Sequence, residues 1–364
     1  MRIQSLACRA LSVPLLEPFV IASARVETTR AVLVSVVLED ERTGQTAPGL
    51  GEAAALFPVT WEDQPDLLLA VEAAAARCIG QRWADLPALG AQLDAAHATS
   101  LVARSGVECA LLDAHARLAH VPLCQLLGGT PSLLVTDITL PIAQPEHMAD
   151  LAAAYRARGF TAFKVKVGKC FDDDARALLA VHARVPDATF RLDANEGFSP
   201  QQAVELCALA RLAGLQVDCF EQPCAAGELD AMARVTREAG VPVIADESVK
   251  SERDLALVVA HRAAHGINLK LAKSGGLVAA LALGRAARRA GLSVMCGGMV
   301  ETRLGMSAMA HVACALGGVE YIDLDTAMLL AEERFDGGYS EQGPELRITG
   351  GVGLDVRERP KPAA

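Results

Sequence analysis

The sequence lacks the features that mark nucleic-acid-binding, membrane-spanning and secreted proteins. Lys and Arg number 34 against 44 for Asp and Glu, the formal net charge is −10, and no block of five or more basic residues occurs, so no nucleic acid partner is expected. No stretch approaches the roughly 18 uninterrupted apolar residues of a membrane span. Residues 1–14 carry no apolar run followed by a small-residue cleavage site. We therefore expect a soluble, cytoplasmic protein with no membrane partner.

Paired cysteine motifs are also missing. The ten cysteines are scattered, none forms a Cys-x-x-Cys pair, and most stand in apolar surroundings. This distribution is typical of small buried side chains rather than of disulfides or zinc ligands. Because no His or helix start lies in an obvious position to lower a thiol pKa, nucleophilic cysteine chemistry is not indicated. We expect reduced cysteines in a reducing cytosol.

Glycine-rich nucleotide motifs are absent as well. No Gly-x-Gly-x-x-Gly follows the first strand of either region, which argues against a dinucleotide-binding open sheet. The glycines at 350–353 are not followed by Lys-Ser or Lys-Thr, so they do not form a phosphate loop.

The first third of the chain has the pattern of an α+β unit. Strands are expected at residues 2–12 and 31–38, separated by small and charged residues at 17–29 and followed by a turn-rich segment at 40–51. Apolar residues then recur at spacings of three and four, which predicts helices at residues 67–79, 86–98 and 103–120. Gly128, Gly129 and Pro131 mark the end of this pattern.

The rest of the chain alternates short apolar runs with Ala-rich helical segments. Eight runs are expected to be strands: residues 133–140, 162–167, 189–193, 216–221, 242–246, 266–270, 293–296 and 320–325. Eight strands with helices between them favour a closed parallel barrel, and a doubly wound open sheet is the alternative. A further strand and turn at 345–356 is expected to return to the first unit.

Charged residues end five successive strands of this predicted barrel. They are Lys164 with Lys166, then Asp193, Glu221, Asp246 and Lys270, and the separations from Lys166 onward are 27, 28, 25 and 24 residues. A single acid at a strand end is usually a helix N-cap. Five in register, at about the length of one βα unit, predict convergence at the mouth where barrel enzymes place their chemistry.

The three acids have the character of a magnesium site. Asp193, Glu221 and Asp246 would offer hard oxygen ligands from three adjacent strands, which suits Mg²⁺. Zinc would favour His or Cys, and neither stands at these positions.

Lysines flank the acids on both sides in strand order. Lys166 and Lys270 would face each other across whatever the metal holds, and a nearby divalent cation lowers a Lys pKa toward that of a base. Two opposed bases imply that a proton leaves one face of a substrate and returns to the other. Lys164 shares the inward face of Lys166 and is expected to keep Lys166 partly neutral and to bind a substrate oxygen.

Together these motifs resemble those of the enolase superfamily, in its muconate-lactonizing subgroup. The matching segments are Lys-Val-Lys (164–166), Asp-Ala-Asn (193–195), Glu-Gln-Pro (221–223), Ala-Asp-Glu-Ser (245–248), Asn-Leu-Lys (268–270) and Gly-Met-Val-Glu-Thr (298–302).

The resemblance implies a modified TIM barrel, (β/α)7β, at residues 129–340. It also implies an α+β N-terminal capping domain at residues 1–128, to which about 341–364 returns. Asp193, Glu221 and Asp246 would hold Mg²⁺, and Lys166 and Lys270 would exchange an α-proton through an enediolate, in the known pairing of a Lys base with Mg²⁺. The implied activity is that of an isomerase, a racemase or epimerase of amino acid derivatives.

Within the subgroup, the last strand favours a dipeptide epimerase. Asp323 and Asp325 share one face, and an Asp-x-Asp at this place in similar dipeptide epimerases pairs with the free α-ammonium of the substrate. By the same resemblance, Thr139 and the backbone near Gly298 would contact substrate. N-acylamino acid racemase, o-succinylbenzoate synthase and muconate cycloisomerase are the alternatives within the superfamily.

Selectivity for the carboxy-terminal residue is expected from the capping loops at 17–29 and 51–61. Arg25 could bind an acidic side chain, whereas Glu17, Glu27 and Glu52 leave a basic or apolar one open. Outside the superfamily, a Schiff-base lyase or a noncatalytic binding protein are the competing hypotheses. Which dipeptide is used, and whether the chain forms a homo-oligomer, are left open by the sequence.

Overall fold

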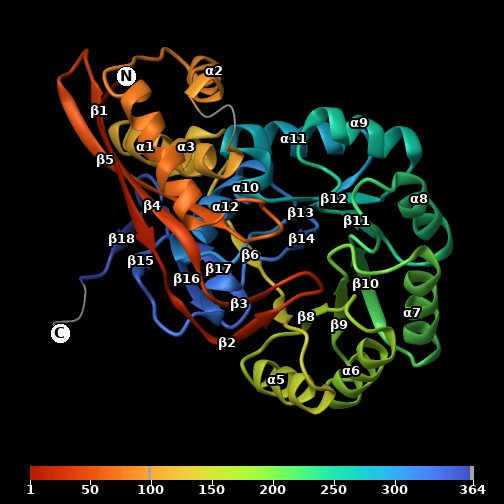
Figure 1. Ribbon diagram of the computed structural model, residues 1–364. Coiled ribbons are helices and arrows are strands. Elements are labelled where there is room, and N and C mark those ends of the chain that lie inside the picture. The colour runs from red at the N-terminus through yellow and green to blue at the C-terminus, as the bar shows by residue number, and fades with distance from the viewer. Residues whose placement is uncertain (97–99, 361–364) are drawn as a thin grey trace.

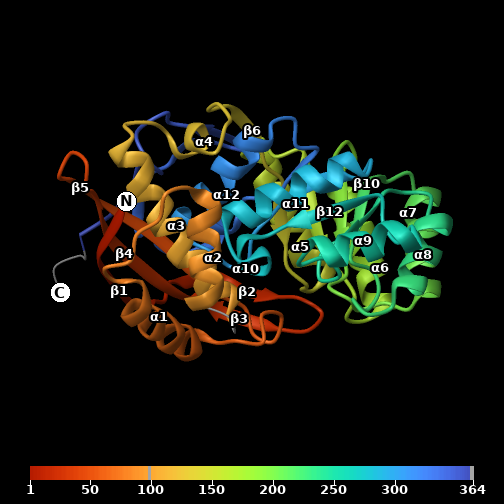
Figure 2. The ribbon, with the colours of Figure 1, turned by 90° about the horizontal axis from the view of Figure 1, so that it is seen from above.

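The computed structural model describes residues 1–96 and 100–360, which form two units lying side by side. Figures 1 and 2 show a smaller N-terminal unit of strands and helices beside a larger ring of strands surrounded by helices. Among the described helices, none is both long enough and apolar enough to cross a bilayer.

An antiparallel sheet organises the N-terminal unit. Its strands are β1 (Arg2–Leu11), β4 (Arg30–Asp40) and β5 (Gln45–Ala55), in the order β1-β4-β5. The predictions for β1 and β4 are confirmed. The turn-rich prediction at 40–51 is wrong from Gln45 onward, since β5 pairs with β4 along its whole length.

Close helix packing explains why β5 was not recognised. A Cβ added at Gly49 would lie 2.0 Å from the carbonyl oxygen of Ala110, and one at Gly51 would lie 2.1 Å from that of Gly106. The strand must therefore carry glycine where α3 crosses it. Glycine is depleted in ordinary strands, so the residues that allow this contact also obscure the strand in the sequence.

Four helices follow the sheet. They are α1 (Gln64–Cys78), α2 (Leu86–Ala96), α3 (Leu101–Leu118) and α4 (Leu123–Leu126). The three long helices confirm the predictions at 67–79, 86–98 and 103–120, although residues 97 and 98 lie outside the described part. α1 begins at a capping box of Asp63 and Asp66, and the Ser100 hydroxyl accepts the Ala103 N–H at 3.0 Å at the start of α3.

A hairpin joins the N-terminal unit to the mouth of the barrel. Its strands are β2 (Pro14–Val20) and β3 (Arg25–Thr28), and Figure 1 shows it extending from the sheet toward the barrel. The Ile142 N–H, just beyond the first barrel strand, donates to the Val20 carbonyl at 2.9 Å. The hairpin therefore covers the mouth.

The larger unit is a barrel of eight parallel strands. In order around the sheet they are β7 (Ile138–Leu140), β8 (Ala162–Lys166), β9 (Thr189–Asp193), β10 (Gln216–Glu221), β11 (Val243–Ala245), β12 (Gly266–Leu269), β13 (Ser293–Cys296) and β14 (Tyr321–Ile322). Every neighbouring pair is parallel. The Asp137 N–H donates to the Ile322 carbonyl at 3.2 Å, which links the first strand to the last. The structure therefore supports the closed barrel over the open sheet.

Helical crossovers connect these strands, as the (β/α)7β arrangement requires. They are α5 (Pro145–Ala157), α6 (Phe171–Arg184), α7 (Pro200–Leu212), α8 (Leu229–Glu238), α9 (Glu252–His261), α10 (Leu271–Ser274) with α11 (Leu277–Arg289), and α12 (Arg303–Leu316). A 3-10 turn, η1 (Thr326–Leu329), follows β14.

The run at 133–140 was predicted as one barrel strand and proves to be two. Its first part, β6 (Leu133–Val135), pairs antiparallel with β17 (Glu345–Ile348), which also pairs with β16 (Tyr339–Gln342). A last pair is formed by β15 (Phe335–Gly337) and β18 (Val356–Glu358). Between β17 and β18, the Leu354 N–H donates to Asp113 Oδ1 of α3 at 2.7 Å, so the C-terminal segment contacts the N-terminal unit.

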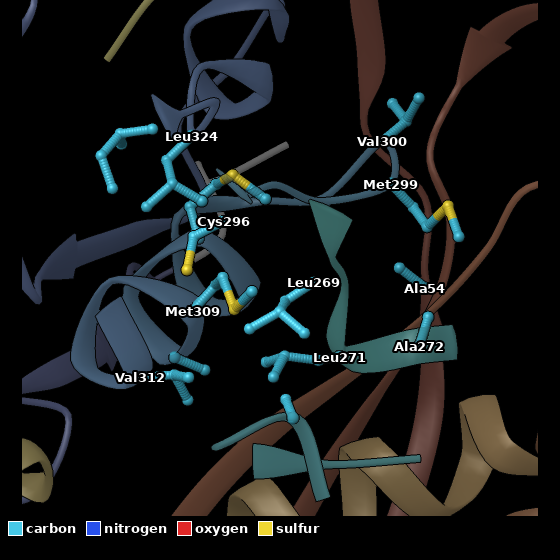
Figure 3. Close-up of a cluster of buried hydrophobic side chains, with 14 of the residues drawn as sticks. Ala54, Leu269, Leu271, Ala272, Cys296, Met299, Val300, Met309, Val312 and Leu324 are labelled. Carbon is cyan, nitrogen blue, oxygen red and sulfur yellow. The ribbon is translucent and has the colours of Figure 1, made fainter. Parts of the chain in front are cut away.

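Apolar and polar contacts fix the N-terminal sheet to the barrel. Figure 3 shows Ala54 of β5 with Ala272 of α10 and Met299 in a buried apolar cluster. Beside it the buried Glu52 carboxylate accepts N–H groups from Thr302 and Gly305 at 3.0 Å each. One unit therefore supplies the anion that caps the N-terminus of α12 in the other.

A buried histidine on α12 gives a testable pH dependence of stability. His311 Nδ1 accepts the Cys124 N–H at 3.0 Å, and burial lowers the pKa of His311 to about 4. Because the unfolded chain binds this proton near pH 6.5 and the folded chain does not, the stabilisation is complete above pH 6.5 and is lost as the pH falls toward 4.

Urea unfolding of wild type and His311→Gln at about pH 7.5 and about pH 4.5 measures this effect. The advantage of wild type over the variant should shrink by about 2–3 kcal/mol at the lower pH. The glutamine amide oxygen can still accept the Cys124 N–H, so the variant controls for that hydrogen bond. An advantage that is the same at both pH values would contradict the assignment.

Candidate active site

Six charged side chains from neighbouring strands meet at the carboxyl end of the barrel. In the β-ladder Lys166 is the register partner of Asp193, and Asp193 is that of Glu221. Asp246 follows β11 directly, Lys270 follows β12, and Lys164 is the sixth, on β8 with Lys166. All of these side chains are buried, with Lys166 the most exposed at 7%. The barrel geometry therefore brings together the residues whose spacing predicted convergence.

Lys164 lies at the centre of the cluster. Its Nζ is 2.7 Å from Glu221 Oε2, 2.7 Å from Asp323 Oδ2 and 3.0 Å from Asp193 Oδ2. Burial alone would lower the pKa of Lys164, but these carboxylates raise it well above its ordinary value. Lys164 is therefore a fixed cation that holds carboxylates from three strands together.

Lys166 and Lys270 approach the row of carboxylates from its two ends. Lys166 Nζ lies 2.6 Å from Asp193 Oδ2 and donates to Asn195 Oδ1 at 3.1 Å. Lys270 Nζ lies 2.7 Å from Asp246 Oδ2 and 3.9 Å from Glu221 Oε1. Three strands, β9 to β11, separate them in the sheet. Burial would lower the pKa of Lys270, but Asp246 and Glu221 raise it above its ordinary value.

The three carboxylates differ in pKa. Burial and then Asp193 raise the pKa of Glu221 to about 7. Burial would do the same to Asp193 and Asp246, but adjacent lysines hold the pKa of each below its ordinary value. Glu221 Oε2 is buried, touches Lys164 Nζ and accepts no hydrogen bond. A buried carboxylate oxygen that accepts no hydrogen bond, next to the carboxylates of Asp193 and Asp246, is a suitable ligand for Mg²⁺, which prefers hard oxygen donors.

Two further residues hold these carboxylates, and neither was given a role from the sequence, although Asn268 belongs to the Asn-Leu-Lys segment (268–270). Lys273 Nζ contacts Asp246 Oδ1 and donates to the carbonyls of Asp246 at 2.5 Å and Asn268 at 2.9 Å. The Asn268 side chain donates to Glu221 Oε1 at 2.7 Å. Lys273 could have been recognised in the sequence from its position three residues after Lys270, which places both on the same side of a helical turn.

A second acidic group lies beside Lys164, where β14 meets β7. Carboxylate oxygens of Asp137, Asp323 and Asp325 all lie within 4.8 Å of one another. Asp325 Oδ2 accepts the Thr139 N–H at 2.5 Å, while Asp325 Oδ1 and Asp137 Oδ1 are buried without a hydrogen-bond partner.

The three acids of this second group differ in pKa and in their partners. Burial would raise the pKa of Asp323, but Lys164 lowers it, and Arg191 Nη1 lies 2.8 Å from Asp137 Oδ2. Burial and then Asp323 raise the pKa of Asp325 to about 6, and burial raises the pKa of Asp137 well above its ordinary value. Asp137 ends a short connection between β6 and β7, and no pattern in the sequence distinguishes it from other acids. Converging acids of this kind are stabilised when a cation lies among them.

A cavity of about 30 Å³ is lined by the three lysines of the first group and by Asp323 of the second, whereas Asp325, also predicted to bind substrate, is buried and does not line it. Its floor includes the predicted residues Thr139, Lys164, Lys166, Lys270, Gly298 and Asp323. Its roof contains Phe19 and Ile21 from the β2–β3 hairpin and Leu56 and Val59 from the segment after β5. Both capping loops expected to determine selectivity therefore contribute side chains.

Gly298 and Arg25 were both predicted to contact substrate, and only Gly298 lines the cavity. At Gly298 an added Cβ would lie 2.3 Å from Met306 Cε. A side chain would therefore meet Met306, and the backbone of Gly298 itself lines the cavity. Arg25 does not line the cavity. Its side chain is 59% exposed and pairs with Glu27 at 3.0 Å, because its strand position directs it to solvent.

Comparison with known proteins agrees with this architecture. A family model described as "Enolase C-terminal domain-like" matches residues 147–359, and one for the "Mandelate racemase / muconate lactonizing enzyme, N-terminal domain" matches residues 5–128. An L-Ala-D/L-amino acid epimerase of Populus trichocarpa is 39% identical over 95% of this chain and 82% of its own. An aromatic dipeptide epimerase of Herpetosiphon aurantiacus is 37% identical over 97% of this chain and 98% of its own.

Solved structures extend the likeness to the whole fold. The crystal structure of a dipeptide epimerase from Enterococcus faecalis, complexed with Mg and the dipeptide L-Leu-L-Tyr, superposes with a TM-score of 0.90 at 30% identity. The match covers 98% of this chain and 99% of that one. On the strength of its barrel, its capping unit and these matches, the chain belongs to the mandelate racemase and muconate lactonizing enzyme family of the enolase superfamily.

Proposed function

We propose that this protein is a magnesium-dependent dipeptide epimerase that inverts the α-carbon of the carboxy-terminal residue. The observation that carries the proposal is the placement of Lys166 and Lys270 at opposite ends of one row of three buried carboxylates. Relatives named as dipeptide epimerases, at 37–39% identity over nearly the whole chain, support the same conclusion.

Asp193, Glu221 and Asp246 would hold the metal in this proposal. Mg²⁺ bound there would stabilise the negative charge that develops on the substrate carboxylate when the α-proton leaves. Asp246, now paired with Lys270 at 2.7 Å, would share its negative charge with the metal, and the pKa of Lys270 would then fall toward that of a base.

The two lysines would divide the proton transfer. In one direction a neutral Lys166 takes the α-proton and a protonated Lys270 returns one to the opposite face, and in the other direction the roles reverse. Lys164, held between three carboxylates, would remain protonated and bind a substrate oxygen.

The second acidic group would bind the free α-ammonium of the dipeptide. An ammonium offers three N–H donors, and the unpartnered Asp325 Oδ1 lies among acids that a cation stabilises. N-acylated amino acids carry no such cation, which favours the dipeptide over the substrate of an N-acylamino acid racemase. Thr139 and Gly298 would contact the peptide backbone.

A cytoplasmic location is part of the proposal. All ten cysteines are free, and eight of them are buried. Free thiols in these numbers are typical of a reducing compartment.

Exchange of the α-proton in D₂O, followed by proton NMR, tests the function directly. A panel of L,L-dipeptides should exchange and epimerise at the second residue, EDTA should abolish exchange, and Mg²⁺ should restore it. N-acetylated dipeptides serve as controls and should exchange at least about tenfold more slowly, because a charged hydrogen-bonded contact is lost. Equal exchange rates for N-acetylated and free dipeptides would exclude a dipeptide with a free α-ammonium as the specific substrate. Exchange without metal, together with trapping of the protein by borohydride, would favour the Schiff-base lyase.

Alanine variants of the two lysines test the division of labour. Lys166→Ala and Lys270→Ala should each lower epimerisation by about 10² or more, because each removes one acid–base group. Each variant should keep α-proton exchange with one epimer only, and the two should prefer opposite epimers. The exposed Lys169→Ala is the control and should behave as wild type. Loss of exchange without stereochemical preference would contradict a two-base arrangement.

A variant of the second acidic group separates substrate binding from metal binding. Asp323→Asn should raise KM for free dipeptides by about tenfold to a hundredfold. Its affinity for Mn²⁺, measured by electron paramagnetic resonance, should stay within about twofold of wild type, since Asp323 is not a proposed ligand. The surface variant Asp173→Asn is the control, and an unchanged KM for Asp323→Asn would remove Asp323 from the substrate site.

A further inference from the structure

The charged side chains that line the cavity all have a partner or a role in the proposed function. They are Lys164, Lys166, Lys270 and Asp323. Lys164 is held by three carboxylates, the other two lysines are the proposed bases, and Asp323 belongs to the acidic group for the substrate ammonium. Among the described residues that line the cavity, none remains to pair with a charged side chain of the substrate.

Besides the charged side chains and the uncharged polar ones of Thr139, Asn195 and Thr326, the cavity is lined by six apolar side chains. Phe19 and Ile21 come from the hairpin, Leu56 and Val59 from the segment after β5, and Met299 and Val300 from the loop after β13. Five of the six are less than 9% exposed, and Val59 is half-buried. We call these six residues the roof. Three separate parts of the chain therefore present a hydrocarbon surface to one side of the substrate.

One cation lies against this surface: Lys166 Nζ is 5.9 Å from the centre of the Phe19 ring, and this lysine is already paired with Asp193. Arg25 is directed to solvent and paired with Glu27. Lys250 and Lys273 line a neighbouring cavity, and Val59 and Met299 lie on the boundary because they line both. Lys273 is already bound to Asp246.

An acidic substrate side chain would have to leave water without gaining a free counter-ion from the cavity lining, where each lysine already has a carboxylate partner, and this is strongly unfavourable. A basic one would meet only Asp323, which is paired with Lys164, because Glu62 lines the neighbouring cavity.

We infer that the roof binds an apolar side chain on the carboxy-terminal residue of the dipeptide and discriminates against acidic and basic ones. Apolar surface buried against the roof contributes binding without any need for a counter-ion. The inference rests on the proposed function, because it takes the floor as the place where the main chain of the substrate is bound.

Relative kcat/KM for dipeptides of matched size tests the inference. L-Ala-L-Leu should exceed L-Ala-L-Glu and L-Ala-L-Lys by at least about a hundredfold, with L-Ala-L-Gln between them. Leu, Gln and Glu have similar lengths, so the series separates charge from size. A kcat/KM for the Glu or Lys dipeptide equal to or above that of Leu would overturn the inference while the epimerase function stands. Failure of every dipeptide would instead reject the proposed function.

A cation placed in the roof should change the preference. Leu56→Arg should raise the ratio of kcat/KM for L-Ala-L-Glu to that for L-Ala-L-Leu by at least about tenfold, and Ile21→Arg provides a second position if the first variant does not fold. Leu16→Arg is the matched control, because Leu16 lies on the same hairpin but is 64% exposed and outside the cavity. An unchanged ratio in folded Leu56→Arg and Ile21→Arg proteins would show that the roof does not contact the side chain and would overturn the inference.

Discussion

Compensation of buried charge at the barrel mouth is the constraint on which the site depends. Four lysines and four carboxylates are buried there in mutual contact: Lys164, Lys166, Lys270, Lys273, Asp193, Glu221, Asp246 and Asp323. None of these groups could be buried alone without a large cost. A divalent cation would add two positive charges to these four lysines and four carboxylates. The negative charge of the substrate carboxylate and the loss of one proton from a lysine can compensate for them. Charge balance thus links metal binding, substrate binding and base formation.

The predictable part of the site is the part that follows strand periodicity. Charged residues at the ends of apolar runs could be recognised because they interrupt an otherwise hydrophobic pattern, and parallel strands bring their carboxyl ends to one mouth. Asp137 could not be recognised, since it lies in a two-residue connection between strands of different sheets. Nor could the destination of Arg25, because the sequence does not show which face of the hairpin meets the barrel.

The fold was predictable to the same degree and for related reasons. Barrel strands at 189–193, 216–221 and 293–296 have the predicted bounds. Each is a short run that is buried toward its carboxyl end, although Arg191 and Asp218 interrupt the apolar pattern in two of them. β5 was not predicted because it carries glycine where α3 packs against it, and glycine is uncommon in strands. The split of residues 133–140 between β6 and β7 depends on pairing with β17, which lies more than two hundred residues away in the chain.

The composition of the cavity wall has a consequence for the proton that is returned. Lysines of the barrel share this wall with apolar side chains of the hairpin and of the segment after β5, so residues of the N-terminal unit stand between the buried ammonium groups and bulk water. In the proposed reaction the returning proton would then come from Lys166 or Lys270 rather than from solvent, and the stereochemical outcome would be set by the protein.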